Sequence, residues 1–251
     1  MKVHINLMYH DVYIHDKCES GFIRTIDFPY KLNVEKFESH VRCIRDLCKQ
    51  KSLSPNDVIF TFDDGGKSFY TVIAPVLEKY GFKGLFFVST QYIGTENFLT
   101  KEEIVQLYKS GHIIGSHAHS HEHFYSLSTS QIDMEWETSI RILSEIVDSE
   151  ITYASVPNGD VTKQVIKSAY KYGIRHLYTS EPTVNICKYN DMYIYGRYVL
   201  LENSSSKYVQ SLIEDKTVRL FLLFRRKIIK IIKFMLGYNY TRFKNLFCHT
   251  R

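Results

Sequence analysis

Two adjacent carboxylates at the end of an apolar strand constrain this sequence more than any other feature. Thr61-Phe62-Asp63-Asp64-Gly65 follows Val58-Ile59-Phe60, a β-branched and aromatic run that predicts a buried strand. Because neighbouring side chains of a strand point to opposite faces, Asp63 and Asp64 can serve one site only where the backbone bends. Two like charges this close also need a positive group between them to stay ionised. Alone, the stretch is more typical of a solvated Asp-Asp-Gly turn.

A histidine-rich segment favours a metal site over that simple turn. His117-Ala118-His119-Ser120-His121-Glu122-His123 follows a strand predicted at 112–116. His117 and His121 are four residues apart, so one helical turn or a tight loop places both imidazoles on one side. Two imidazoles and one carboxylate form the ligand set of a divalent transition metal that keeps positions open for water and substrate. A histidine-rich tract can also be a solvated loop, but its combination with Asp63-Asp64 favours a built site.

Strands that alternate with helices predict an α/β fold. Strands are expected at 3–8, 58–60, 84–88, 112–116, 151–156, 174–179 and 193–200, and helices at 33–51, 68–80, 100–111, 129–147, 162–173 and 204–214. This order implies βα units and a parallel sheet, either open or closed into a barrel. The carboxyl ends of such strands form the active face. Five side chains capable of chemistry follow strands there: His10, Asp63, Asp64, His117 and His121.

The charge of the chain divides it into two parts. The net charge is +5, and ten basic residues with no acidic one follow Asp215, so the preceding part carries −5. A mildly acidic body argues against nucleic acid as the substrate. We therefore expect a catalytic domain at 1–215 and a separate basic segment at 216–251.

The basic segment has an amphipathic pattern. Arg226, Lys230 and Lys233 recur at i, i+4 and i+7, and aromatic and aliphatic residues fall on the other side of the same predicted helix. Such a helix is typical of one that lies in a membrane interface, and we expect residues 219–236 to contact an anionic membrane. The other interpretation is a terminal helix packed on the barrel with a solvated basic edge.

The cysteines and the N-terminus predict a cytoplasmic protein, peripheral to the inner face of the membrane. The five cysteines are odd in number and show no CxxC spacing, which favours reduced thiols. Residues 3–8 are too short and too polar for the apolar core of a signal peptide. No run approaches the roughly 20 apolar residues of a membrane-spanning helix.

These motifs resemble the polysaccharide deacetylase (NodB-homology, carbohydrate esterase family 4) domain. Its T-F-D-D-G motif matches residues 61–65 letter for letter. Its H-[ST]-x-x-H motif in an I-G-S-H context matches residues 114–121, with Ala118 replacing the usual hydroxyl residue. The opening Tyr9-His10-Asp11 and the segments 178–182 and 196–199 are similar to the branch that deacetylates poly-N-acetylglucosamine. The resemblance covers residues 3–200 and implies an irregular (β/α) barrel of the NodB-homology type, followed by the basic helical tail.

The resemblance also implies a ligand set and catalytic roles. Asp64, His117 and His121 would hold the metal, usually Zn²⁺ but replaceable by Co²⁺, Ni²⁺ or Fe²⁺. Asp63 would be the general base toward the attacking water, whose pKa the metal lowers. The backbone N–H of Asn158, which follows the proline of the next motif, would donate to the oxyanion.

Two departures from the family pattern leave the general acid and the partner of the base to be assigned. The usual C-terminal L-x-H motif, which supplies the general acid, is missing. We therefore assign the general acid to His10, because the branch with the Y-H opening would use this histidine. The alternative is that His10 is hydrogen-bonded in a structural role. Ser155 stands where the family often has arginine. Arg197 is therefore the candidate to orient Asp63, and the alternative for it is a surface ion pair.

The motifs together predict a metal-dependent hydrolase. It would remove N-acetyl groups from amino sugars of a polysaccharide or of a lipid-linked glycan precursor. The same site could serve an O-acetyl esterase, and the missing L-x-H also leaves open a catalytically degenerate glycan-binding protein. His119 and His123 are expected to line the cleft without binding metal.

Overall fold

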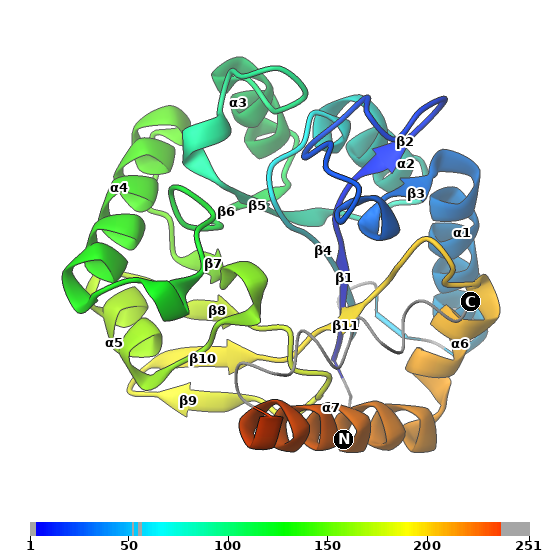
Figure 1. The fold of residues 1–251 in the computed structure, drawn as a ribbon. Helices are drawn as coiled ribbons and strands as arrows, with labels where there is room; N and C mark the ends of the chain where they lie inside the picture. The colour runs from blue at the N-terminus through cyan, green and yellow to red at the C-terminus, as the bar shows by residue number, and fades with distance from the viewer. Residues whose placement is uncertain (1–3, 52, 55–56, 237–251) are drawn as a thin grey trace.

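A curled sheet with helices outside it forms the body of the protein (Figure 1). The computed structural model describes residues 4–51, 53–54 and 57–236. The sheet has nine strands in the order β11-β1-β4-β5-β6-β7-β8-β10-β9, and all neighbours are parallel except β9 and β10. The strands are β1 Ile5–Tyr9, β4 Val58–Phe62, β5 Gly84–Val88, β6 Ile113–Ser116, β7 Tyr153–Ser155, β8 His176–Tyr178, β9 Cys187–Tyr189, β10 Met192–Tyr195 and β11 Tyr198–Val199. The predicted irregular (β/α) barrel is confirmed.

The helices lie around the outside of this sheet (Figure 1). They are α1 Val34–Lys51, α2 Ala74–Lys79, α3 Lys101–Lys109, α4 Thr129–Val147, α5 Lys163–Lys171, α6 Ser206–Glu214 and α7 Lys216–Leu236. A small parallel pair, β2 Val12–Tyr13 and β3 Leu32–Asn33, precedes α1. The helix expected at 68–80 begins instead as a π-helical turn, Phe69–Ile73, before α2.

Aromatic packing fixes the strands that end at the site. Every residue of β1 and β5 is buried, as expected for parallel strands covered on both faces. Phe62 at the end of β4 packs on Phe86, with ring centroids 5.1 Å apart, and on Tyr9 at 5.5 Å. Each fully buried phenylalanine contributes about 1.5–3 kcal/mol to stability. The residues that follow β1 and β4 are therefore attached to strands that packing holds rigidly in place.

The single strand predicted at 193–200 is wrong. The structure has two strands there, and they lie far apart in the sheet: β10 pairs with β8, and β11 pairs with β1. The chain leaves the first at Gly196, where a Cβ would meet the backbone oxygen of Glu181 at 2.4 Å, so only glycine fits this close approach. The crossing places Arg197 in the interior, where it is 1% exposed.

The basic segment forms α7, which runs along the side of the barrel between β9 and α6 (Figure 1). Val218 and Leu222 of this helix pack against the main core. Within the described part of the chain, none of the helices combines the length and the apolar composition needed to cross a bilayer. The remainder of the predicted segment, 237–251, lies outside the described residues, and the boundary at 215 stays a prediction.

Candidate active site

A cavity of about 560 Å³ opens at the carboxyl ends of the strands. Six of the seven predicted site residues line it: His10, Asp63, Asp64, His117, His121 and Asn158. The seventh, Arg197, lies behind Asp63 and contacts it directly. The loop before α1 forms a further wall with Phe22, Arg24 and Tyr30, which the sequence analysis did not predict.

The backbone after β4 sends the two aspartates in different directions. Asp63 continues the strand, and its N–H donates to the backbone oxygen of Tyr9 at 3.1 Å. Asp64 has a φ of 90° and Gly65 a φ of 94°, so the chain reverses at this point. Positive φ at a residue other than glycine costs on the order of 1–3 kcal/mol and persists only where the surroundings enforce it. This strained turn lets both carboxylates reach one cavity.

Asp64 faces the two predicted histidine ligands. Its Oδ1 lies 3.4 Å from His117 Nε2 and 3.2 Å from His121 Nε2. The three potential ligand atoms all lie within 4.8 Å of one another. The loop between the histidines is not helical, because Ala118 has a φ of 61° and His121 a φ of 63°. A tight left-handed loop therefore brings the imidazoles to one side.

Hydrogen bonds on the far side of His117 fix which nitrogen faces Asp64. His117 Nδ1 lies 2.6 Å from Ser155 Oγ and 3.2 Å from the Ser155 backbone oxygen. Ser155 Oγ donates to Asp63 Oδ1 at 3.1 Å, so it accepts from Nδ1, which carries the proton. His117 Nε2 then presents a lone pair toward Asp64, as a metal-binding imidazole does.

The Asp64 carboxylate fits a cation. Within the described part of the chain, its buried Oδ1 has no assigned hydrogen-bond partner. A carboxylate oxygen and an imidazole lone pair that face each other repel unless a positive charge lies between them. Burial alone would raise the pKa of Asp64, but the charge of His121 and contacts from both imidazoles hold it well below its usual range. Asp64, His117 and His121 are therefore suited to hold a divalent metal.

Asp63, in contrast, has complete partners within the protein. Arg197 Nη1 donates to Oδ1 at 2.6 Å and Nη2 to Oδ2 at 2.7 Å. Arg197 also donates to Thr61 Oγ1 and to the Thr179 backbone oxygen, both at 3.1 Å. Burial would raise the pKa of Asp63, yet the guanidinium charge holds it below its usual range. Because both side chains are buried, the alternative of a surface ion pair is wrong.

His10 lies across the cavity without a structural hydrogen bond at one nitrogen. Its ring packs on Tyr30, with centroids 4.7 Å apart, and its buried Nδ1 has no hydrogen-bond partner in residues 4–51, 53–54 and 57–236. Another histidine, His176, stacks on Tyr153 with ring centroids 4.4 Å apart and is hydrogen-bonded to the hydroxyl of Tyr195. His176 is absent from the cavity lining.

Asn158 and the remaining histidines of the 117–123 segment lie beside the candidate metal ligands. Asn158 has a φ of 56° within the short turn Pro157–Gly159, and its side-chain amide donates to the backbone oxygen of His121 at 3.4 Å. His123 lines the cavity and contacts Asp160 at 2.8 Å, as expected of a lining residue. His119 does not line it, because its Nδ1 turns to Thr90 Oγ1 at 2.9 Å, so that expectation is wrong.

Comparison with known proteins identifies the family. The profile described as polysaccharide deacetylase matches residues 50–177, about half of the chain. The chain belongs to this family. YxkH of Bacillus subtilis (strain 168), named as a polysaccharide deacetylase, is 29% identical over 190 residues, which cover 70% of this chain and 64% of YxkH. A chitin deacetylase of Arthroderma benhamiae is 32% identical over 102 residues, covering 40% of this chain and 27% of the relative.

The fold is also found in a solved structure. IcaB from Ammonifex degensii superposes with a TM-score of 0.69 at 20% identity, covering 85% of this chain and 98% of IcaB. The chain spans less than two thirds of the length of the two curated relatives. The structural likeness therefore shows the fold and the matching profile shows the family, while the substrate must be argued from the site.

Glu135 supports the site in this deacetylase fold, and sequence reasoning missed it. Its carboxylate accepts from the backbone N–H groups of His119 and Ser120, each at 2.8 Å, and from Ser120 Oγ at 2.7 Å. These bonds hold the loop that ends at His121. The sequence around Glu135 does not indicate this role, because Glu135 is one of several acidic residues of α4 and the residues that it contacts lie before this helix.

Proposed function

We propose that this protein is a metal-dependent hydrolase that removes N-acetyl groups from amino sugars of a polysaccharide or lipid-linked glycan. The observation that carries the proposal is the division between neighbouring carboxylates. Asp63 is paired with Arg197, whereas the Oδ1 of Asp64 has no partner and faces two imidazoles. A hydrolase needs both features, because one carboxylate must take a proton and the other must bind the metal.

A divalent cation held by Asp64, His117 and His121 would lower the pKa of a water and polarise the acetyl carbonyl. Asp63 would accept the proton of the attacking water, and the Arg197 fork keeps its oxygens oriented and ionised.

The other half of the reaction would use the opposite wall of the cavity. The backbone N–H of Asn158 would donate to the negative carbonyl oxygen as the C–O bond forms. His10 would give its proton to the departing amine as the C–N bond breaks, so that acetate and a free amino sugar result. The free Nδ1 of His10 and its place in the cavity suit this role.

Family membership and the name of the chitin deacetylase support an N-acetylated glycan as the substrate. An O-acetyl sugar would use the same residues, since the attacked carbonyl is the same and only the leaving group differs. The fully partnered Asp63 speaks against a degenerate binding protein. The thiols of Cys18, Cys43, Cys48 and Cys187 are free, which supports action in the cytoplasm.

The test is acetate release by full-length protein that has been stripped with a chelator and reloaded with Zn²⁺, Co²⁺, Ni²⁺ or Fe²⁺. Substrates are N-acetylated glucosamine oligomers and matched O-acetylated sugars, and the free amine is measured beside acetate. We expect about one metal per chain and equal release of acetate and amine. Acetate without amine would favour the esterase. Full metal occupancy with no release from any acetylated sugar would contradict the proposal.

A further inference from the structure

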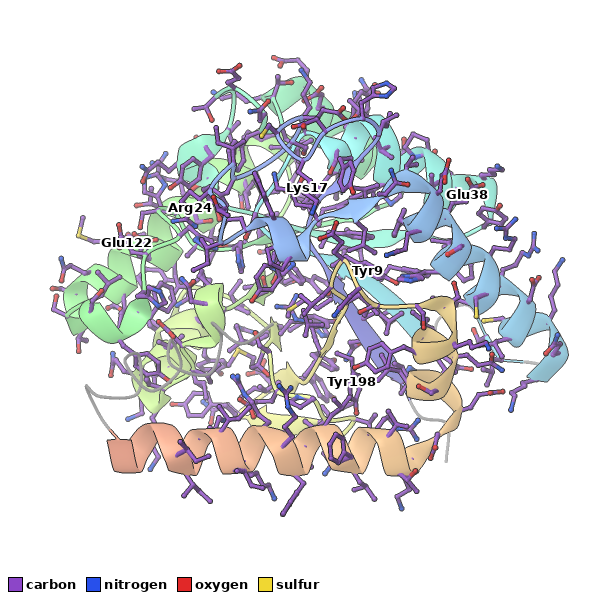
Figure 2. All side chains as sticks on the ribbon, turned by 45° about the vertical axis from the view of Figure 1, so that its right-hand side comes forward. Tyr9, Lys17, Arg24, Glu38, Glu122 and Tyr198 are labelled. Carbon is purple, nitrogen blue, oxygen red and sulfur yellow. The ribbon has the colours of Figure 1, made fainter. Side chains whose placement is uncertain are left out.

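The apolar side of α7 faces solvent. Phe221, Phe224, Ile228 and Ile231 follow one another at intervals of three, four and three residues, so they form one stripe along the helix. Phe221 is 64% exposed, Phe224 62% and Ile231 57%. Figure 2 shows a row of side chains that project from α7 away from the barrel. We call these four residues the α7 stripe.

The side of α7 that faces the barrel combines the core contacts of Val218 and Leu222 with polar contacts of its basic residues. Lys230 Nζ lies 2.7 Å and Arg226 Nε 3.3 Å from the Oε1 of Glu181, in the loop after β8. Arg219 Nη1 donates to the backbone oxygens of Leu212 and Ile213 at the end of α6. The helix therefore does not present a purely solvated basic edge.

The outward side of α7 differs from that of an ordinary surface helix. Such a helix buries its apolar stripe and turns its charges to water, as α1 does with Phe37, Val41 and Ile44. Contacts with Glu181, with α6 and with the core through Val218 and Leu222 fix α7 so that the α7 stripe faces solvent. Because large contiguous apolar patches are rare on surfaces that stay in water, the α7 stripe calls for a covering partner.

We propose that the α7 stripe docks on the surface of an anionic lipid bilayer. Arg225 and Lys227 are exposed on either side of the stripe, and Lys216 is exposed at the start of the helix. α7 contains no acidic residue. An apolar stripe with basic flanks matches acyl chains below anionic headgroups. A second copy of the chain fits less well, because two such stripes would bring basic flanks together.

The docked helix would place the bilayer beside the cavity. Arg226, on the inward side of α7, also lines the cavity that holds Asp63 and Asp64. One helix therefore contacts the membrane on one side and the cavity on the other. In so far as the proposed function holds, this arrangement suits a glycan carried on a lipid, although the docking itself does not depend on the reaction.

Sedimentation of full-length protein with vesicles tests the docking. The vesicles are phosphatidylcholine alone, or phosphatidylcholine with 30% phosphatidylglycerol, at low and at high salt. We expect binding to the anionic vesicles that weakens with salt. The double variant Phe224→Ser/Ile228→Ser should bind at least about tenfold more weakly, because two inserted side chains are lost. Arg225→Gln/Lys227→Gln should bind a few-fold more weakly.

Met134→Ser is the matched control, because Met134 is 62% exposed on α4, away from α7. It should bind vesicles as the wild type does. Equal melting temperatures and equal acetate release from a short soluble substrate would show that the variants are folded. The proposal fails if wild-type protein ignores anionic vesicles or if the double variant binds as well as wild type. It also fails if the double variant only converts a dimer to a monomer, since the partner is then a second copy.

Discussion

The cavity has two sides, one around Asp63 and one around its neighbour Asp64. The two sides differ in how many hydrogen-bond partners the protein supplies to each carboxylate. We call Asp63, Ser155 and Arg197 the base side, after the proposed role of Asp63, and both oxygens of its carboxylate accept hydrogen bonds. We call Asp64, His117 and His121 the metal side, after their proposed role, and one oxygen of its carboxylate has no hydrogen-bond partner among the described residues. The difference teaches that residue type does not decide the role of an aspartate here. The partners of each carboxylate decide its proposed role, and the turn of the backbone at Asp64 determines which partners that carboxylate contacts.

Removal of a metal-side imidazole should have the largest effect. His121→Ala leaves too few ligands, so we expect metal content to fall to background and turnover to fall by about three orders of magnitude or more. Metal analysis and acetate release measure both. His119→Ala is the control, because its ring bonds to Thr90 outside the cavity, and it should keep both metal and activity. Full metal occupancy in His121→Ala would refute the ligand assignment.

Removal of His10, the predicted general acid, should lower turnover without loss of the metal. His10→Ala should lower kcat by about two to four orders of magnitude on an N-acetylated sugar while the metal stays bound. The loss should be much smaller on an aryl acetate, since a phenolate with a low pKa leaves without a proton. His176→Ala should change neither substrate. Equal losses on both substrates in His10→Ala would mean that His10 is structural.

A subtle change on the base side should have the smallest effect. Arg197→Lys keeps the charge but loses the two-pronged contact with Asp63, so we expect kcat to fall about tenfold at neutral pH. The guanidinium holds the pKa of Asp63 low, and the base works only when ionised. A weaker contact raises that pKa, so the acidic limb of the pH–rate profile should move to higher pH. An unmoved limb, with the melting temperature lowered, would leave Arg197 a purely structural role.

Local sequence order predicted all three residues of the metal side, and Asp63 and His10 as well. His10, Asp63, Asp64, His117 and His121 each follow a strand, and parallel strands bring such residues to one edge. The apolar runs of β4 and β5 are long enough to be unambiguous, and the helix expected at 129–147 coincides with α4.

The other features of the site and the orientation of α7 depend on contacts between residues far apart in the sequence, so the sequence predicted them less well. The sequence predicted the pairing of Arg197 with Asp63, but it predicted one strand where the structure has two. The break falls at Gly196, whose close approach to the backbone of Glu181 is a contact between residues distant in sequence. The role of Glu135 depends on backbone N–H groups about 15 residues away. The periodicity of α7 revealed two sides but not which side faces the barrel, since Glu181 decides that.

Paired substitutions of the two aspartates test the division between the two sides most directly. Asp63→Asn and Asp64→Asn each remove one charge with almost no change of shape, so metal content and acetate release can be compared in otherwise equal proteins. We predict that Asp63→Asn keeps about one metal per chain and loses several orders of magnitude in turnover, whereas Asp64→Asn loses both. Metal retained in Asp64→Asn but lost in Asp63→Asn, or turnover at the wild-type rate in Asp63→Asn, would contradict the assignment.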